Sequence, residues 1–430
     1  MPTSENIGAY LGLGTGYRLS IPGWQQEVAL AAPLGLGFVR GNFDVWDLYQ
    51  PSAGTFDFAK LDQILGTLGG MKLFLTLPIS AAWNRGAVGC PGTYALTGSQ
   101  VGCTAWPTQD PEDLLELAFM IANRYKGSIG HFEVWNEPDF GQFWKAEQDP
   151  VADDYLPLLR TAYEGIKSIN PEATVMMGGL AFPQEPPNPL RPGWFDRFIE
   201  LGGLNYTDKI NVHIYPAFGS FPATVERMKT KMRQAGVEKG IWITETSSTG
   251  GRFNTGNLEA EEYAKAVWLV KNYTWAFTNP EVEKIFWHTL RIQAPYDFAL
   301  MAEDGTVKPA YTAHQTWSRL LIPSEFVTSN ITGNVRNIVY KNNNNLYTNI
   351  IWTESGTVDV VIPSERGIIA PKMTTIFGVE SNLTRGQVVQ VGTEPVYLTY
   401  YRLGLGKTGI QLQRSGRVEA SSADDRIRRS

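Results

Sequence analysis

The chain has 430 residues, of which 43% are hydrophobic and 12% aromatic, enough for one large domain and a second, small one. Its formal charge of −6, without a long basic run, argues against nucleic acid or an anionic membrane surface as the main partner. No stretch of about 18 apolar residues occurs, so no membrane insertion is expected, and the first residues lack the pattern of a signal peptide.

Up to residue 322, short apolar segments alternate with amphipathic helical stretches, which is the pattern of βα units on a parallel sheet. The predicted strands are 8–12, 38–42, 72–77, 130–135, 174–179, 209–215, 240–244 and 284–289. The clearest predicted helices are 61–68, 111–125, 153–169, 194–201, 222–235 and 259–277. This α/β pattern predicts a (β/α)8 TIM barrel over residues 1–322. A doubly wound sheet is disfavoured, because the glycines at 12, 14 and 16 lack the spacing of a dinucleotide-binding turn.

The pattern changes after Pro323, where short alternating segments are separated by turn residues. The predicted strands are 335–340, 346–352, 357–362, 373–377, 388–391 and 395–402. They indicate a C-terminal β-sandwich accessory domain over residues 323–404. The polar end of the chain, 405–430, is predicted to be a disordered tail.

Side-chain alternation predicts which strand residues reach the barrel lumen. In the fourth strand Glu133, Trp135 and Glu137 are expected to share one face, and in the sixth Asn211, His213 and Tyr215. In the seventh, Ile243 and Glu245 are expected to share a face, and in the second, Arg40 and Asn42. Polar residues facing the lumen near the strands' carboxyl ends are typical of the active end of such a barrel.

Two glutamates carry the functional prediction. Glu137 follows the fourth strand in Trp135-Asn136-Glu137-Pro138, and Glu245 lies near the end of the seventh. Two carboxylates in one pocket are what hydrolysis of a glycosidic bond requires. Glu133 is interpreted as a buried, paired acid lower in the barrel. His213, Arg40 and Trp287 each have a second interpretation, as core or ion-pair residues.

Thirteen tryptophans suit a sugar-binding protein, because the C–H face of a pyranose stacks on an indole, although many must simply fill the core. The aromatic residues assigned to upper loops are Trp83, Trp106, Trp144, Phe218 and Tyr296.

Cys90 and Cys103 lie in a Gly-rich loop and are either a disulfide or two unrelated thiols. A disulfide would favour a periplasmic or secreted location. No metal site is expected there, since no further His or Cys is near.

The motifs together resemble the retaining glycoside hydrolases of clan A, and most closely family 39, over most of residues 8–322. The segments that carry the resemblance are residues 133–139 with Phe143-Trp144, His213-Ile214-Tyr215, Thr244-Glu245-Thr246 and residues 305–311, which resemble a closing helix. A β-sandwich after the barrel is also typical of that family.

The resemblance implies that Glu137 is the general acid/base and Glu245 the nucleophile. It further implies that Asn136 binds the sugar 2-hydroxyl, that His213 and Tyr215 hold Glu245, and that Arg40 keeps Glu245 ionised. The substrate-binding residues expected are Arg40, Asn136, His213, Tyr215, Trp287, Trp144 and Trp83.

The sequence thus predicts a retaining β-glycosidase that acts on an oligo- or polysaccharide, without a metal or organic cofactor. The spread of loop aromatics favours endo-action. The alternatives are an exo-acting, β-xylosidase-like enzyme, a transglycosylase with the same residues, and a catalytically silent carbohydrate-binding barrel. The oligomeric state does not follow from the sequence.

Overall fold

The computed structural model describes residues 3–10, 21–42, 46–85, 92–93, 100–101, 105–144, 151–181, 193–215, 221–248, 257–291, 298–403 and 411–413. The chain divides into two compact units, Met1–Phe326 and Val327–Ser430. The division falls four residues after the boundary expected at 322. Within the described residues no helix is both long and apolar enough to cross a membrane.

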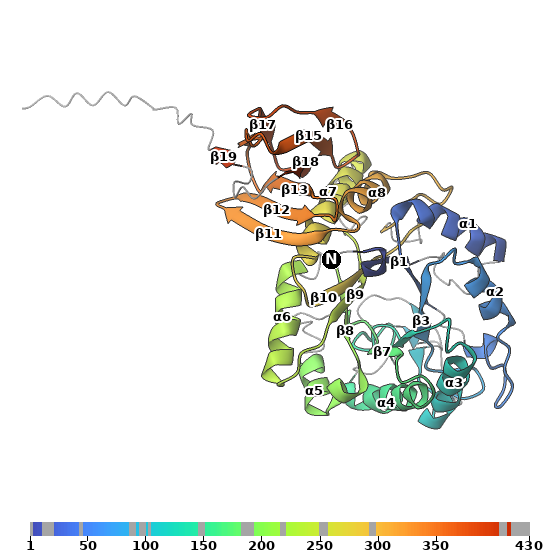
Figure 1. The fold of residues 1–430 in the computed structure, drawn as a ribbon. Coiled ribbons are helices and arrows are strands. Elements are labelled where there is room, and N and C mark those ends of the chain that lie inside the picture. The colour runs from blue at the N-terminus through green and yellow to red at the C-terminus, as the bar shows by residue number, and fades with distance from the viewer. Residues whose placement is uncertain are drawn as a thin grey trace, which may run out of the picture. The chain divides into compact units, whose positions relative to one another are not determined.

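The first unit is built around eight parallel strands (Figure 1). They are β1 (Ile7–Tyr10), β2 (Phe38–Asn42), β3 (Lys72–Leu77), β6 (His131–Val134), β7 (Thr174–Met177), β8 (Ile210–Ile214), β9 (Ile241–Thr246) and β10 (Val282–Trp287). Their order is β7-β6-β3-β2-β1-β10-β9-β8. A parallel bridge between Leu180 and Val212 joins the two outer strands, so the sheet is a nearly closed barrel. All eight predicted strands are present, which confirms the (β/α)8 prediction.

Helices surround this sheet in Figure 1. They are α1 (Ile21–Ala31), α2 (Ala59–Thr67), α3 (Pro111–Arg124), α4 (Ala152–Ile169), α5 (Trp194–Glu200), α6 (Phe221–Gln234), α7 (Leu258–Ala276) and α8 (Pro309–Leu321). Capping signals are local: the Asp110 side chain accepts a hydrogen bond from Glu112 N before Pro111 at the first turn of α3. Helix α1 was not among the clearest predictions, because Pro22 and Gly23 at its start interrupt the helical pattern.

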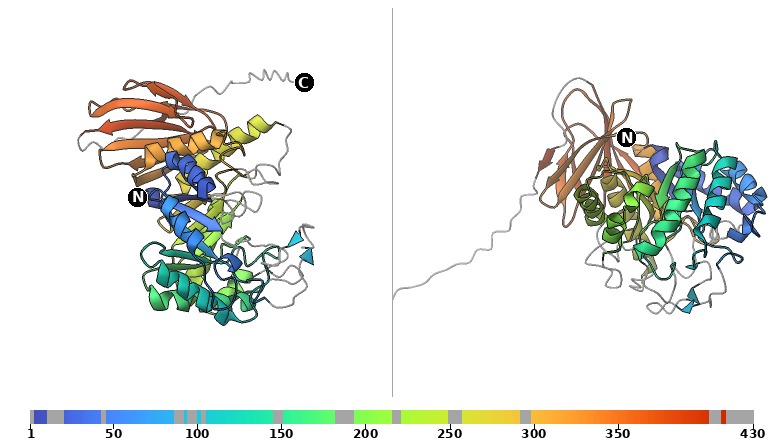
Figure 2. Two further views of the ribbon diagram at one scale, coloured as in Figure 1. Left: turned by 90° about the vertical axis from the view of Figure 1, so that its right-hand side faces the viewer. Right: turned by 90° about the horizontal axis from the view of Figure 1, so that it is seen from below.

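Short elements complete the first unit. The 3-10 turns are η1 (Ser4–Asn6), η3 (Ala32–Leu34), η4 (Trp46–Leu48) and η6 (Gly203–Tyr206). Strands β4 (Gly92–Thr93) and β5 (Gln100–Val101) pair with each other and stand off the body of the barrel in both views of Figure 2.

The barrel lumen is filled in layers, as side-chain alternation requires. An apolar layer contains Phe38, Phe74, Met176, Trp242 and Phe286, each from a different strand. One step closer to the carboxyl ends lies a polar layer that contains Arg40, Thr76, Glu133, Asn211 and Thr244, all buried. The floor of any site at the carboxyl ends is therefore rigid and polar.

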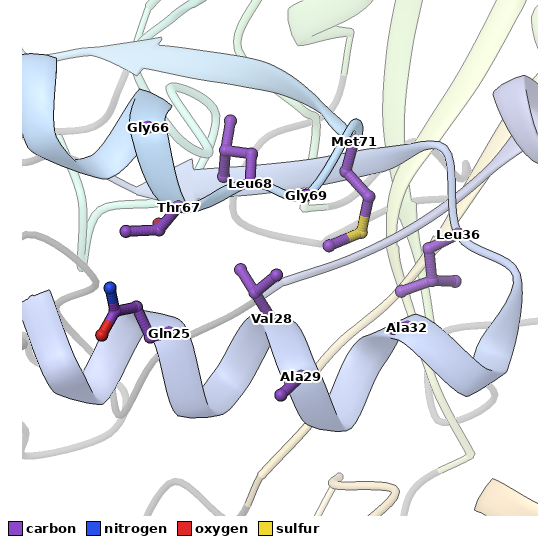
Figure 3. A pocket seen from close by; sticks show the side chains of 10 residues that line it. All are labelled: Gln25, Val28, Ala29, Ala32, Leu36, Gly66, Thr67, Leu68, Gly69 and Met71. Atoms are coloured by element: carbon purple, nitrogen blue, oxygen red, sulfur yellow. The ribbon is translucent and has the colours of Figure 1, made fainter.

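A cavity of about 390 Å³ lies between α1 and the connection from α2 to β3 (Figure 3). Its lining includes Gln25, Val28, Leu36, Thr67 and Met71. The connection enters β3 at its amino end, so this cavity is at the opposite end of the strands from Glu137 and Glu245. None of its lining residues is titratable.

The second unit contains antiparallel sheets. The strands are β11 (Glu325–Thr332), β12 (Val335–Lys341), β13 (Leu346–Thr353), β14 (Val358–Val361), β15 (Ile368–Thr375), β16 (Glu380–Asn382), β17 (Val388–Val391), β18 (Val396–Arg402) and β19 (Gln411–Gln413). They form the sheets β11-β12-β13-β18-β15-β16 and β17-β14-β19. One apolar cluster takes residues from both sheets, including Ile351 and Leu398 from the first and Val360 and Val391 from the second. This is sandwich packing.

Several details of the second unit differ from the prediction, among them strands β11 and β16, which were not predicted. Strand β15 begins at Ile368, five residues before the predicted segment, and its first half is irregular, with a register shift between Ile369 and Lys372 and a positive φ at Ala370. Within the range 405–430, which was predicted to be disordered, Gln411–Gln413 pairs with β14. A strand of three residues is too short to leave a periodic signal.

Candidate active site

Glu137 reaches the barrel mouth through an irregular backbone rather than through strand alternation. Strand β6 ends at Val134, and Trp135 and Glu137 both have positive φ values, 70° and 47°. Residues with side chains rarely adopt such angles outside functional sites. Hydrogen bonds from Trp135 N to Leu77 O (3.0 Å) and from Glu137 N to Gly179 O (3.1 Å) hold the segment to its neighbours. Regular alternation therefore ends at Val134, and Glu137 reaches the mouth beside His213 and Glu245 by this irregular turn.

Glu245 reaches the same mouth through a β-bulge. The register of β8 and β9 pairs Val212 with Ile243 but His213 with Glu245, which leaves Thr244 as the extra residue. Thr244 donates a hydrogen bond to Asn211 Oδ1 in the lumen (2.6 Å). The bulge lets Glu245 face inward as well. The predicted common face for Ile243 and Glu245 is wrong, since alternation alone would have turned Glu245 away from the lumen.

Arg40 lies beneath both glutamates and has no exposed surface. Its Nη1 donates to Glu245 Oε1 at 2.5 Å, its Nη2 to Asn136 Oδ1 at 2.8 Å, and its Nε to Glu133 Oε2 at 2.8 Å. One planar guanidinium thus orients three side chains, two from β6 and the turn after it and one from β9. The contact with Asn136 also assigns the flip of its amide, with the oxygen toward Arg40.

Glu133 is buried, as predicted, and is surrounded by donors. Besides Arg40, it accepts hydrogen bonds from Thr76 Oγ1 (2.7 Å), Gly179 N (3.0 Å) and Asn211 Nδ2 (2.7 Å). Both oxygens of this buried carboxylate therefore have hydrogen-bond partners. Glu133 lies on the far side of Arg40 from Glu245, and it acts on the mouth through that arginine.

His213 contacts both glutamates, and it lies closer to Glu137 than to Glu245. Its Nδ1 is 2.7 Å from Glu137 Oε1 and 3.5 Å from Glu245 Oε2. His213 was expected to hold Glu245, but its short hydrogen bond goes to Glu137, and its contact with Glu245 is longer. Gly179 makes room for the ring: a Cβ at that position would lie 2.1 Å from His213 Nε2. The packing here requires glycine.

Tyr215 and His288 lie beside Glu245. The hydroxyl of Tyr215 donates to Glu245 Oε2 at 2.7 Å. The ring of His288 is edge-on to Tyr215, with centroids 6.3 Å apart, and Phe298 packs on both rings at 5.3 and 5.8 Å. These three rings form one wall of the mouth on the side of Glu245.

Trp287 does not line the mouth. Its ring packs against Trp268 and Tyr273 of α7, and it has no exposed surface. Phe286 lies in the lumen layer, so alternation turns Trp287 outward and His288 inward. The substrate-binding prediction for Trp287 is wrong, and its alternative interpretation as core packing is correct. His288 was missed, although the same alternation pointed to it.

The loop tryptophans differ in exposure. Trp144 has no exposed surface and packs edge-on against Tyr155 of α4, so it supports the segment after β6 and offers no face to a ligand. Trp83 is half-buried, with its indole N–H donating to Gln50 O at 2.8 Å. The predicted ligand role is thus contradicted by burial at Trp144 and stays a prediction at Trp83. Cys90, Cys103, Phe218 and Tyr296 lie outside the described residues.

The two glutamates are driven toward opposite protonation states. Burial, the charge of Glu245 and that of Asp139 raise the pKa of Glu137 well above its ordinary value. Burial opposes ionisation of Glu245, yet the charge of Arg40 and the hydrogen bond from the Tyr215 hydroxyl lower its pKa. Burial lowers the pKa of His213 to about 3 and also lowers that of His288, so Arg40 is the permanent cation here. The resting pair is a protonated Glu137 and an ionised Glu245.

The pair is close. One carboxylate oxygen of each glutamate and one nitrogen of His213 all lie within 4.8 Å of one another. Retaining glycosidases place their carboxyl groups about 5–5.5 Å apart, and inverting ones about 6.5–9.5 Å. The same three atoms are within reach of a single cation, but a guanidinium already neutralises Glu245. The residues therefore fit acid–base chemistry better than metal binding.

Comparison with known proteins agrees with this chemistry. Residues 112–313 match the family model of the glycosyl hydrolase catalytic core. A family 39 glycoside hydrolase from Bacteroides cellulosilyticus WH2 has a similar fold, with a TM-score of 0.67, 20% identity, and 92% of this chain and 80% of that one covered. The catalytic domain of GH30 xylanase C from Talaromyces cellulolyticus has a TM-score of 0.58, 13% identity, and coverages of 93% and 97%.

Native xylanase 10B from Thermotoga maritima is also similar, with a TM-score of 0.51, 16% identity, and 74% of this chain and 95% of that one covered. A search of curated proteins gave no match. The family model spans both Glu137 and Glu245, and these findings support a glycosidase.

Proposed function

We propose that this chain, with its glycosyl hydrolase catalytic core, is a retaining β-glycosidase that cleaves an oligo- or polysaccharide by double displacement. The observation that carries the proposal is the facing of Glu137 and Glu245 within 4.8 Å, with their pKa values shifted in opposite directions. We assign catalysis to the barrel unit and an accessory role to the β-sandwich.

In the first step the ionised Glu245 attacks the anomeric carbon, while Glu137 gives its proton to the oxygen of the leaving group. The bond from the anomeric carbon to that oxygen breaks as the bond to Glu245 forms. Arg40 and Tyr215 hold the two oxygens of the nucleophile by separate hydrogen bonds, at 2.5 and 2.7 Å. Their donation fixes the direction of attack.

In the second step the ester on Glu245 carries no charge, so one cause of the raised pKa of Glu137 is gone. Glu137 then takes a proton from water, which attacks the same carbon and releases Glu245 as a carboxylate. Because the carbon is inverted twice, the product keeps the anomeric configuration of the substrate. His213, neutral through burial, keeps Glu137 oriented in both steps.

The proposed substrate is a chain of sugars, cleaved internally. Two half-buried aromatic residues in the connection from β3 to α3, Trp83 and Trp106, suit a groove with more than one subsite. Exo-action on a terminal sugar and transfer to a sugar acceptor use the same two carboxylates, and product analysis distinguishes them. A silent binding barrel is disfavoured, since such proteins have no need for two carboxylates with opposed pKa shifts.

The test is a panel of aryl β-glycosides and neutral polysaccharides, followed by proton NMR of the first product formed. Hydrolysis with initial release of the β-anomer supports the proposal. Initial release of the α-anomer would refute retention. Absence of turnover on the whole panel, with sugar binding preserved, would favour the binding barrel.

A further inference from the structure

Two half-buried aromatic side chains lie next to the proposed acid. Phe140 follows Glu137 by three residues, and its N–H donates to Glu137 O at 3.0 Å, which closes a tight turn. Trp106, from the segment after β5, packs with Phe140 against the same residue, Ala105. The ring of Phe140 is further held edge-on by Phe143, with centroids 5.8 Å apart. An aromatic surface is thus attached to the acid/base residue itself.

Trp83 belongs to the same connection between β3 and α3 as Trp106. The segment of Trp106 is bound to the segment of Trp83 by hydrogen bonds from Thr108 N to Ile79 O (2.7 Å) and from Gln109 N to Asn84 O (3.0 Å). Trp83 is oriented by its hydrogen bond to Gln50 O and by the edge of Trp46, 6.3 Å away. Its ring position is therefore set by the protein and needs no ordering by a ligand.

The two sides of the mouth bind different parts of the substrate in the proposed reaction. The acid must meet the leaving oxygen, so the leaving group occupies the side of Glu137, whereas the sugar that becomes bound to the enzyme lies over Glu245. Tyr215, His288 and Phe298 border Glu245. The aromatic residues that border Glu137 come from the loops after β3 and β6, which are neighbours in the sheet.

We propose that Phe140, Trp106 and Trp83 form the leaving-group subsite, and that it binds a neutral pyranose ring by stacking. The assignment rests on the proposed function. The apolar C–H face of a pyranose matches an aromatic face, and a half-buried ring gains most from being covered by such a face. The subsite makes a sugar leaving group, rather than a small alcohol, the preferred one.

The experiment compares two substrates with the same sugar over Glu245. One is an unactivated β-linked oligosaccharide. The other is the corresponding β-glycosyl fluoride, whose leaving group has no ring to stack. Xylosyl, glucosyl, mannosyl and galactosyl compounds are screened first, and the sugar that the enzyme cleaves is used for both substrates. We expect Phe140→Ala and Trp106→Ala each to lower the ratio of kcat/KM for oligosaccharide over fluoride by about tenfold, the loss typical of truncating a central aromatic contact.

Two controls separate stacking from damage to the acid. Phe140→Tyr keeps the ring and should keep the ratio, whereas Phe140→Leu keeps volume without a planar face and should lower it. Phe298→Ala, on the side of the nucleophile, should slow both substrates and leave the ratio unchanged. Fluoride hydrolysis still needs Glu137 as the base of the second step, so a displaced Glu137 would lower kcat for the fluoride, whereas loss of stacking alone would leave that kcat unchanged.

A third measurement uses the trapped intermediate formed by a 2-deoxy-2-fluoro glycosyl fluoride. Sugar acceptors should accelerate its turnover in the wild type, and less so in Trp106→Ala, because the acceptor uses the same subsite. Equal losses on oligosaccharide and fluoride, or an unchanged ratio, would overturn the subsite and leave the proposed glycosidase intact. Absence of turnover of every fluoride by the wild type would overturn the proposed function itself.

Discussion

Replacement of Arg40 by Met tests the electrostatic basis of the site. The guanidinium nitrogen lies 2.5 Å from Glu245 Oε1 in a fully buried position. Two charges about 4 Å apart at an effective dielectric of about 20 interact by about 4 kcal/mol. At about 1.4 kcal/mol per pKa unit, loss of the cation is expected to raise the pKa of Glu245 by up to about three units.

The assay is the pH dependence of kcat/KM for an aryl glycoside, which should be bell-shaped in the wild type. Its acidic limb belongs mainly to Glu245 and its alkaline limb to Glu137, although the limbs describe the interacting pair. Arg40→Met should move the acidic limb upward and narrow the bell. Arg40→Lys keeps the charge without the planar fork, so it should shift the limb less while still lowering kcat.

Stability gives a second measurement with a defined sign. Because the folded pKa of Glu245 is depressed, its ion pair stabilises the protein above about pH 4.3 and is lost as pH falls through the folded value. Arg40→Met should therefore cost about 3–5 kcal/mol of unfolding free energy at pH 7, and less below about pH 4. An acidic limb at its original pH, together with a stability loss below about 1 kcal/mol, would refute the reasoning.

Other substitutions test the same assignments from different directions. Glu245→Ala should abolish turnover on every substrate, whereas Glu137→Ala should retain most activity on a dinitrophenyl glycoside and yield a β-glycosyl azide with added azide; an α-azide from Glu137→Ala, with a β-azide from Glu245→Ala, would reverse the roles. Gly179→Ala would place a Cβ 2.1 Å from His213 Nε2, displacing the ring and lowering kcat/KM, whereas Gly130→Ala meets no atom within 4 Å and should keep wild-type kinetics. Glu133→Gln leaves Arg40 to Glu245, so the acidic limb should move to lower pH, opposite to Arg40→Met; an upward shift contradicts this network. Titration that finds two reactive thiols would exclude a disulfide between Cys90 and Cys103.

Alternation along regular strands was a reliable guide to the lumen. It predicted that Asn211, His213 and Tyr215 share a face, and the contacts of Asn211 with Glu133 and of Tyr215 with Glu245 agree with it. Strand β8 is itself regular, so its successive side chains point to opposite faces of the sheet.

Alternation failed where the backbone departs from a regular strand. Positive φ values at Trp135 and Glu137, and the extra residue Thr244 in β9, set the directions of the two glutamates. Neither feature has a sequence signal, because the residues involved are not glycine and tertiary contacts impose the angles. In β10 the residues from Lys284 to Trp287 alternate regularly, and the error came from choosing the tryptophan over the histidine beside it.

The arginine fork of Arg40 has a consequence for how new specificities could arise. Its guanidinium donates hydrogen bonds to Glu245, Asn136 and Glu133 below the mouth. Arg40 and these three residues all lie on strands or directly after them. The loops at the barrel mouth can therefore be exchanged without changing the hydrogen bonds of Arg40. Chimeras that carry loops from the xylanases with similar folds are therefore expected to cut other polysaccharides at an unchanged pH optimum.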